Sequence, residues 1–225
     1  MQQHICILPR HLKIKNSSIA RLGCQIIMPK DILIATENKG KIKEIREIFA
    51  DSIFSVHFLD EFKQQLNGVD IQENAKSFEG NALIKAIVIG DALGMITLAD
   101  DSGICVDALD GRPGVYSARY SEAKTDIANY EKVLEELTGV PLEKRTCHYN
   151  CTVAVYDPIT KFVETVNGEW HGKIALAPKG DKSFGYSPIF LPEEFSYLKT
   201  SAEFEHEELI KINHRGKAFR AALKI

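Results

Sequence analysis

The chain has 225 residues, of which 44% are hydrophobic and 26% are charged, which suits a globular protein with one large domain or two lobes. Its net charge of −3 argues against a general nucleic-acid binder, and no apolar run approaches the ~20 residues of a membrane-spanning helix. Five cysteines without a C-x-x-C pair indicate free thiols in a reducing compartment, so we expect a cytoplasmic protein.

Residues 1–27 form a basic segment, and no acidic residue occurs before Asp31. Such a start is typical of a targeting peptide. The alternative is a misassigned start, because Met28 leads almost directly into the first apolar run. We interpret residues 1–27 as a dispensable extension or a misassigned start, and residues 28–225 as a single domain.

The first ordered unit reads as a strand, a glycine-containing loop and a helix. The apolar run Asp31–Ala35 predicts a buried strand, Thr36–Lys41 forms the loop, and apolar residues then recur at helical spacing to Ala50. Such a loop presents backbone N–H groups to an anion, and Lys41 adds positive charge. The Walker spacing is missing, so this loop alone is weak evidence for phosphate binding.

A second helix is expected after Ser77, which is a suitable N-cap, and Gly94 ends it. Asn81 and Lys85 are one turn apart on this helix, so both could face one site. An exposed polar stripe explains the same spacing equally well.

The chain is organised around the stretch that begins at Leu98. Asp100, Asp101 and Ser102 directly follow an apolar run, and we expect the chain to turn at Gly103. Two carboxylates at the end of a buried strand are costly unless a cation or donors compensate them. The carboxyl end of a strand is where α/β proteins bind ligands, and carboxylates suit Mg²⁺ shared with phosphates. A polar turn that caps a helix is the alternative.

The second half of the chain predicts a helix over Asp126–Leu137 and a hairpin whose strands are Cys147–Tyr156 and Phe162–Val166. Cys147, His148 and Cys151 could suggest zinc. On an alternating strand, however, the two thiols share one face and the imidazole points to the other, which favours core thiols.

Two further stretches carry polar and aromatic groups of interest. Phe184 and Tyr186 flank a glycine, an arrangement that can present a flat ring to a planar ligand or simply fill the core. Helical spacing is also expected from Ala202 to Leu209. His214 and Arg215 open a last helix and offer donors for keto oxygens or phosphates.

Together these stretches resemble the inosine triphosphate pyrophosphatase (Ham1-like) family, in the family's order and over residues 32–224. The matching pieces read ATENKGK, FEGNALIKA, ADDSGICVDALDGRPGVYSARY, FGYSPIF and HRGKA. The resemblance implies a mixed α/β fold in which an elongated, curved sheet and two lobes flank a central cleft. It also implies a homodimer and a magnesium requirement.

The resemblance assigns roles by position. Asp101 is implied as general base and metal ligand, with Asp100 beside it. Glu73 is the candidate for the second metal carboxylate, although the family often has a Glu-Glu pair where this chain has Gln72-Glu73. Substrate binding is implied for Thr36, Glu37, Asn38, Lys39, Gly40, Lys41, Ser102, Phe184, Gly185, Tyr186, Ser187, His214 and Arg215. Within that set, the phenyl ring of Phe184 stacks on the purine, and His214 and Arg215 meet its 6-keto oxygen.

Further departures from the family pattern surround this implied pocket. Ser187 stands where the family has an aspartate, and Leu209 stands where it has a substrate-binding lysine that Lys211 replaces only if the helix start shifts. Asn213 takes the place of a serine, which is a milder change. We interpret Gln72, Ser187 and Leu209 together as a sign of altered specificity or weakened turnover.

The leading hypothesis is a Mg²⁺-dependent pyrophosphatase that converts deaminated purine nucleotides (dITP, ITP, XTP, dXTP) to monophosphate and pyrophosphate. The alternative is a nucleotide-binding homologue that has weakened or lost turnover. A septum-inhibitor-like enzyme that acts on pyrimidine nucleotides is disfavoured by the segments around Phe184 and His214.

Overall fold

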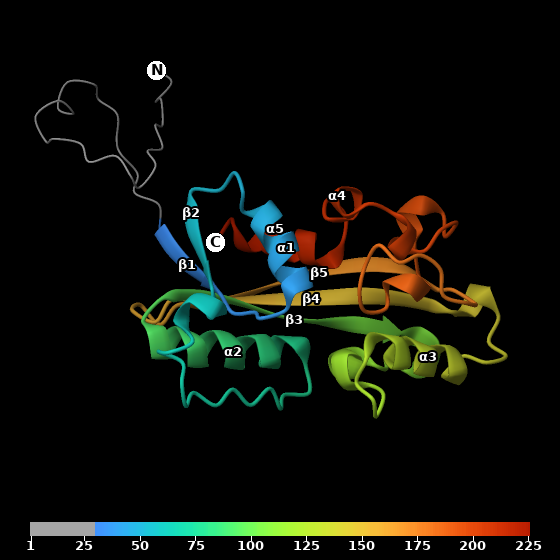
Figure 1. Cartoon of the computed structure of the whole chain (residues 1–225), viewed down its shortest axis with the longest axis horizontal. Coiled ribbons are helices and arrows are strands. Elements are labelled where there is room, and N and C mark those ends of the chain that lie inside the picture. Colours follow the sequence, from blue (N-terminus) through green and yellow to red (C-terminus); the bar gives the residue numbers. More distant parts are fainter. Residues whose placement is uncertain (1–29) are drawn as a thin grey trace, which may run out of the picture.

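The computed structural model describes residues 30–225, so the proposed extension at residues 1–27 lies outside the described residues. The chain forms one mixed six-stranded sheet in the order β2-β1-β3-β4-β5-β6 (Figure 1). The strands are β1 (Lys30–Ile34), β2 (Phe54–Phe58), β3 (Ile96–Val106), β4 (Thr146–Tyr156), β5 (Val163–Ile174) and β6 (Phe190–Pro192). Strand β1 runs parallel to β2 and β3, and the remaining pairs are antiparallel.

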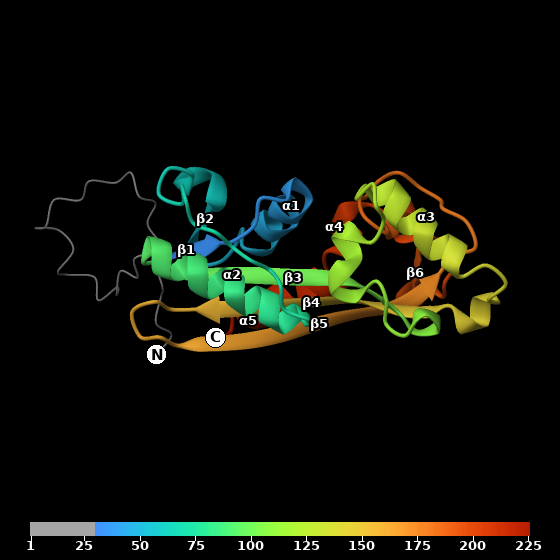
Figure 2. The same cartoon turned by 90° about the horizontal axis from the view of Figure 1, so that it is seen from below.

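Helices cover both faces of the sheet. They are α1 (Lys39–Ile48), α2 (Phe78–Leu93), α3 (Asp126–Glu136), α4 (His206–Leu209) and α5 (His214–Ala222). Figure 1 shows α2 and α3 along one side of the long strands, and α1, α4 and α5 along the other. Seen from below, β1, β2 and α2 gather at one end of the molecule, and α3 and β6 gather at the other (Figure 2). The predicted mixed, elongated α/β architecture is confirmed. Within residues 30–225, no helix is long and apolar enough to cross a membrane.

The helix ends follow from capping chemistry that the sequence displays. The Ser77 hydroxyl accepts the N–H of Gly80 at 3.1 Å at the start of α2, and Gly94 ends this helix in the left-handed region with φ of 63°. At α5 the Asn213 side chain accepts the N–H of Gly216 at 2.7 Å. These two helices therefore begin where the sequence predicts.

The expected turn at Gly103 is wrong, because β3 runs without interruption through this residue to Val106. A Cβ atom at Gly103 would collide with the carbonyl oxygen of Gly114 and with Ser117, which lie in the 3₁₀ turn Gly114–Arg119. The glycine thus permits close packing of that turn on the strand. Asp100 and Asp101 consequently lie within β3, just beyond Leu98, where the pairing with β1 ends.

The hairpin of β4 and β5 is confirmed, and β5 continues as one strand to Ile174. Cys147 and Cys151 are buried free thiols. The segment expected to be helical from Ala202 to Leu209 contains only a 3₁₀ turn and the four-residue helix α4.

A histidine between two carboxylates joins β2 to its neighbours. His57 Nδ1 lies 2.8 Å from Glu61 Oε2, and Nε2 lies 3.2 Å from Asp31 Oδ1. The pKa of His57 is raised above 6.5, mainly by the hydrogen bond to Glu61. Burial lowers this pKa by a smaller amount, and Asp31 raises it further. A raised folded-state pKa gives a stabilisation that is complete below the unfolded pKa and lost as pH rises through the folded value.

We therefore expect the free energy of unfolding to fall between pH 6 and pH 8 by an amount that His57→Asn abolishes. Because both carboxylates are partly exposed, the effect is expected to stay below about 1 kcal/mol. Urea unfolding at the two pH values measures it, with His171→Asn, an exposed histidine on β5, as the matched control. An unchanged pH dependence in the His57 variant would contradict the expectation.

Candidate active site

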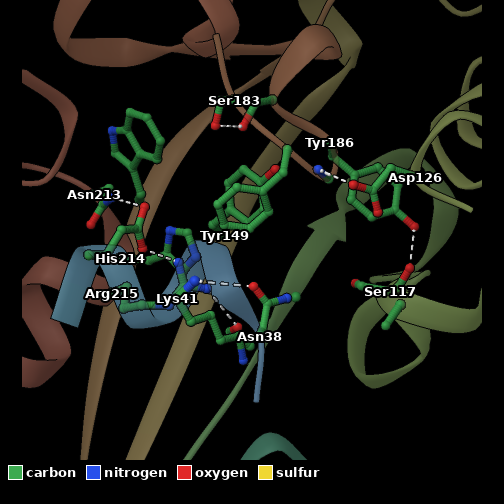
Figure 3. Close-up of a pocket in the computed structure, with 18 of the residues that line it drawn as sticks. Asn38, Lys41, Ser117, Asp126, Tyr149, Ser183, Tyr186, Asn213, His214 and Arg215 are labelled. Atoms are coloured by element: carbon green, nitrogen blue, oxygen red, sulfur yellow. Dashed lines mark hydrogen bonds and ion pairs between the residues drawn. The ribbon is translucent and has the colours of Figure 1, made fainter. Parts of the chain in front are cut away.

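A cavity of about 340 Å³ lies at the middle of the molecule and collects most of the predicted site residues. Figure 3 shows Asn38, Lys41, His214 and Arg215 on one side of it and Tyr186 and Asp126 on the other. The predicted residues that line it are Asn38, Lys41, Glu73, Asp101, Ser102, Phe184, Gly185, Tyr186, Ser187, His214 and Arg215.

Four predicted substrate-binding residues lie outside this lining. Thr36 and Glu37 line a neighbouring cavity of about 580 Å³, which shares Glu73 and Lys85 with the first. Lys39 is exposed. Gly40 instead contacts the ring of Phe184, and a Cβ atom at Gly40 would lie 2.6 Å from that ring.

Asp100 is a buried anion that holds two cations. Its Oδ2 atom accepts a hydrogen bond from Lys41 Nζ at 2.7 Å and lies 3.8 Å from Arg215 Nε. Burial alone raises the pKa of Asp100, but Lys41, Arg215 and Lys85 outweigh it and hold the pKa well below its usual range. Asp100 therefore stays ionised and fixes the positions of Lys41 on α1 and Arg215 on α5.

Asp101 points to the opposite face of β3 and meets α2. Its Oδ2 atom accepts a hydrogen bond from Asn81 Nδ2 at 2.9 Å, and its Oδ1 atom accepts the N–H of Ser102 at 3.0 Å. Burial raises the pKa of Asp101, and this outweighs the opposing effects of Asn81, Lys85 and Lys41. Of the two adjacent carboxylates, Asp101 is thus the more basic, and it faces the cavity.

Lys85 pairs with Glu73, one of the two carboxylates that the resemblance assigns to a metal, and is anchored on β3. Its Nζ atom lies 2.8 Å from Glu73 Oε2 and donates to the carbonyl oxygen of Asp100 at 3.0 Å. Its charge lowers the pKa of Asp101, and Glu73 raises it, so all three groups interact electrostatically.

This donor set fits a hard divalent cation. Asp101 and Glu73 supply carboxylate oxygens in one cavity. Within residues 30–225, no three His, Cys, Asp or Glu side chains are already grouped to hold a metal ion. Any cation there would complete its shell with water or with ligand oxygens, as Mg²⁺ commonly does.

Arg215 is held in place by a buried network that includes Glu44. The Arg215 guanidinium forms an ion pair with Glu44 on α1 through Nη1 and donates to Ser102 Oγ at 3.2 Å through Nη2. Asn213 Nδ2 lies 3.5 Å from Glu44 as well. Burial lowers the pKa of Arg215, but Glu44 and Asp100 more than compensate, so the pKa is raised and the side chain is charged.

His214 forms part of an aromatic wall. Its ring stacks on Tyr149 with ring centroids 4.5 Å apart and an interplanar angle of 7° (Figure 3). The centroid of the Trp170 ring lies 6.4 Å from that of His214. Burial is the main cause that lowers the pKa of His214 well below 6.5, and Arg215 and Lys41 lower it further. The imidazole is therefore neutral near pH 7 and can donate one hydrogen bond. Its Nδ1 atom has no hydrogen-bond partner within residues 30–225.

Ser187 and Leu209, which depart from the family pattern, both lie on the cavity wall. Ser187 Oγ donates to Ser183 Oγ at 3.1 Å on the cavity wall. Leu209 is buried in an apolar cluster and also borders the cavity, which Lys211 does not line. Lys182 does line it and pairs with Glu205, so a lysine is present at the rim even though Leu209 carries no charge.

Sequence reasoning missed Glu44 and left Asn81 and Lys85 undecided. The spacing of Asn81 and Lys85 was a correct signal, because Asn81 donates to the Asp101 carboxylate and Lys85 donates to the backbone carbonyl oxygen of Asp100, both on β3. A signal for Glu44 also existed, since it falls one turn after Lys41 and next to Ile45 on the apolar stripe of α1. An acid on a buried helix face requires a buried cationic partner.

The chain is similar in sequence and in structure to known proteins. The Ham1 family model matches residues 32–225. A dITP/XTP pyrophosphatase from Bacillus subtilis is 42% identical over 203 residues, which cover 89% of this chain and 98% of that protein. A dITP/XTP pyrophosphatase from Geobacter sulfurreducens is 45% identical over 188 residues, which cover 83% of this chain and 92% of that protein. The solved structure of the Staphylococcus aureus Ham1 protein matches with a TM-score of 0.76 at 35% identity, over 87% of this chain and 97% of that one. This chain belongs to the Ham1 family.

Proposed function

We propose that this protein is a Mg²⁺-dependent nucleoside triphosphate pyrophosphatase that hydrolyses dITP, ITP, XTP and dXTP to monophosphate and pyrophosphate. Its relatives from Bacillus subtilis and Geobacter sulfurreducens, each more than 40% identical, are dITP/XTP pyrophosphatases. The main support for this proposal is that three features line one cavity. They are the carboxylate of Asp101, the lysine Lys41 at a helix N-terminus, and the aromatic wall that contains His214.

The phosphate end of the substrate is assigned to the start of α1. The first N–H groups of a helix lack intrahelical partners and favour an anion, and Lys41 lies in that first turn. Asn38 caps the helix by accepting the N–H of Lys41 at 3.1 Å, which fixes the loop before a ligand arrives. Lys41 would neutralise charge that develops on the departing pyrophosphate.

Asp101 is assigned as the general base that takes a proton from the water attacking the α-phosphate. Its raised pKa improves its basicity, and Asn81 and Ser102 hold both oxygens in a fixed orientation. Mg²⁺, held by Asp101 and Glu73, would supply Lewis-acid stabilisation of the phosphate oxygens. Lys85 then keeps Glu73 directed toward the cavity.

The base end is assigned to Phe184, His214 and Arg215. The half-exposed ring of Phe184 is available for stacking, and the donors of His214 and Arg215 would meet a 6-keto oxygen. Adenine presents a 6-amino donor at the same place and would leave these donors unpaired. Sites of this kind discriminate by ~10⁴ or more.

We also place the enzyme in the cytoplasm as a homodimer that removes deaminated precursors from the nucleotide pool. The free thiols of Cys105, Cys147 and Cys151 support the reducing compartment. The homodimer rests on the family resemblance.

A comparison of substrates tests this function. With Mg²⁺, we expect rapid hydrolysis of ITP and XTP, slow hydrolysis of GTP, and none of dTTP or UTP. Preference for dTTP or UTP would contradict the purine assignment.

Leu209 and Ser187 favour the alternative of a binding protein with weakened turnover, because neither supplies a charge to the cavity. That alternative predicts tight ITP binding without release of pyrophosphate. Equal and rapid turnover of ITP and XTP would argue against it.

A further inference from the structure

The segment that carries the stacking ring is attached to α3 by a single carboxylate. The Gly185 N–H donates to Asp126 Oδ2 at 2.8 Å, and this bond connects the loop of residues 183–187 to the first residue of the helix (Figure 3). Gly185 has φ of 64°, a conformation that L side chains rarely adopt. Asp126 lines the same cavity as Phe184.

The next residue of the same loop makes a second attachment. Tyr186 is buried, and its hydroxyl donates to the carbonyl oxygen of Ser117 at 2.7 Å (Figure 3). Asp126 and Ser117 thus hold the two residues that directly follow Phe184. The ring itself reaches across the cavity and contacts Gly40 at the start of α1, where only a residue without a Cβ atom leaves room.

We propose that Asp126 is a positioning residue for recognition of the purine ring. By accepting the Gly185 N–H, it fixes the backbone next to Phe184 and so sets the distance between the stacking ring and the wall of His214 and Arg215. This inference rests on the proposed function, because it needs a purine in the slot. A bond from a backbone N–H to a carboxylate is stronger than one to a neutral acceptor, which suits such a role.

A purely structural role for Asp126 is the competing explanation. An acidic residue in the first turn of a helix interacts favourably with the helix dipole, wherever the loop lies. Thr125 separates the two explanations, because it is the N-cap of the same helix and accepts the N–H of Ala128 at 3.2 Å. Its removal weakens the start of α3 but leaves the bond to Gly185 in place.

The test measures steady-state hydrolysis of ITP and binding of IMP, the latter by fluorescence of Trp170. This residue is the chain's single tryptophan and lines the cavity. For Asp126→Ala, we expect KM for ITP and Kd for IMP to rise about tenfold, with kcat little changed. Inhibition by inorganic pyrophosphate should stay at the wild-type level, because it does not use the purine slot.

Two matched variants complete the test. Asp126→Asn retains an acceptor oxygen and should restore most of the binding, whereas Thr125→Ala should lower Tm without changing KM. The proposal is overturned if Asp126→Ala keeps the wild-type KM, if Asp126→Asn is as impaired as Asp126→Ala, or if Thr125→Ala raises KM equally. Failure of the wild-type protein to bind IMP or hydrolyse ITP would instead overturn the proposed function, and this inference with it.

Discussion

Replacing Asp101 with asparagine is expected to reduce pyrophosphate release from ITP by about 10³-fold, within the range for loss of a general base. The amide cannot accept a proton at neutral pH. It also cannot satisfy both neighbours, because Asn81 Nδ2 and the Ser102 N–H each donate to one carboxylate oxygen. Steady-state kinetics with a coupled pyrophosphate assay measures the loss.

The same substitution is expected to leave the fold intact. The lost hydrogen bond is offset by removal of a buried charge that the protein disfavours, as the raised pKa of Asp101 indicates. Asp110→Asn is the matched control, because Asp110 is exposed beyond β3 and asparagine tolerates its left-handed conformation at φ of 55°. Retention of near-normal turnover by the Asp101 variant would exclude it as the base.

Replacing Glu44 with glutamine is expected to affect both stability and base discrimination. Glu44 forms a buried ion pair with Arg215, and the neutral amide leaves Asp100 as the remaining carboxylate that pairs with the guanidinium within residues 30–225. Breaking a buried pair typically costs about 3–5 kcal/mol, and the remaining Asp100 should keep the cost near the lower end. Urea unfolding measures this change.

The kinetic signature separates Glu44 from a residue that only supports the fold. Because Glu44 orients the donor assigned to the 6-keto oxygen, the ratio of kcat/KM for ITP to that for ATP should fall along with the overall rate. Glu47→Gln is the matched control: Glu47 lies one turn further along α1, is partly exposed and pairs with His206. An unchanged ITP to ATP ratio in the Glu44 variant would show that Arg215 is not positioned by this carboxylate.

The parts of the fold that sequence could predict are those governed by local chemistry. Ser77, Gly94 and Asn213 mark helix ends through capping, which depends on residues only a few positions apart. The alternation of Cys147, Tyr149 and Cys151 likewise identified a strand. These features require no knowledge of distant contacts.

The parts that sequence could not predict depend on distant neighbours. Gly103 resembles a turn residue, and only the approach of Gly114 and Ser117 explains why it lies within a strand. Asp100 and Asp101 look equivalent in sequence. The cations of α1 and α5 hold the pKa of Asp100 low, while burial raises the pKa of Asp101. The partner of Asp126 lies 59 residues away, so its N–H acceptor role has no local signal.

The proposed function requires that the cavity around Asp101 directs water to the α-phosphate of a deaminated purine nucleotide. The most direct test incubates the wild-type protein with ITP and Mg²⁺ in H₂¹⁸O and analyses both products by mass spectrometry. We expect equal amounts of IMP and pyrophosphate, with the ¹⁸O label in IMP. Release of inorganic phosphate, label in pyrophosphate, or no hydrolysis of ITP would contradict the proposed function.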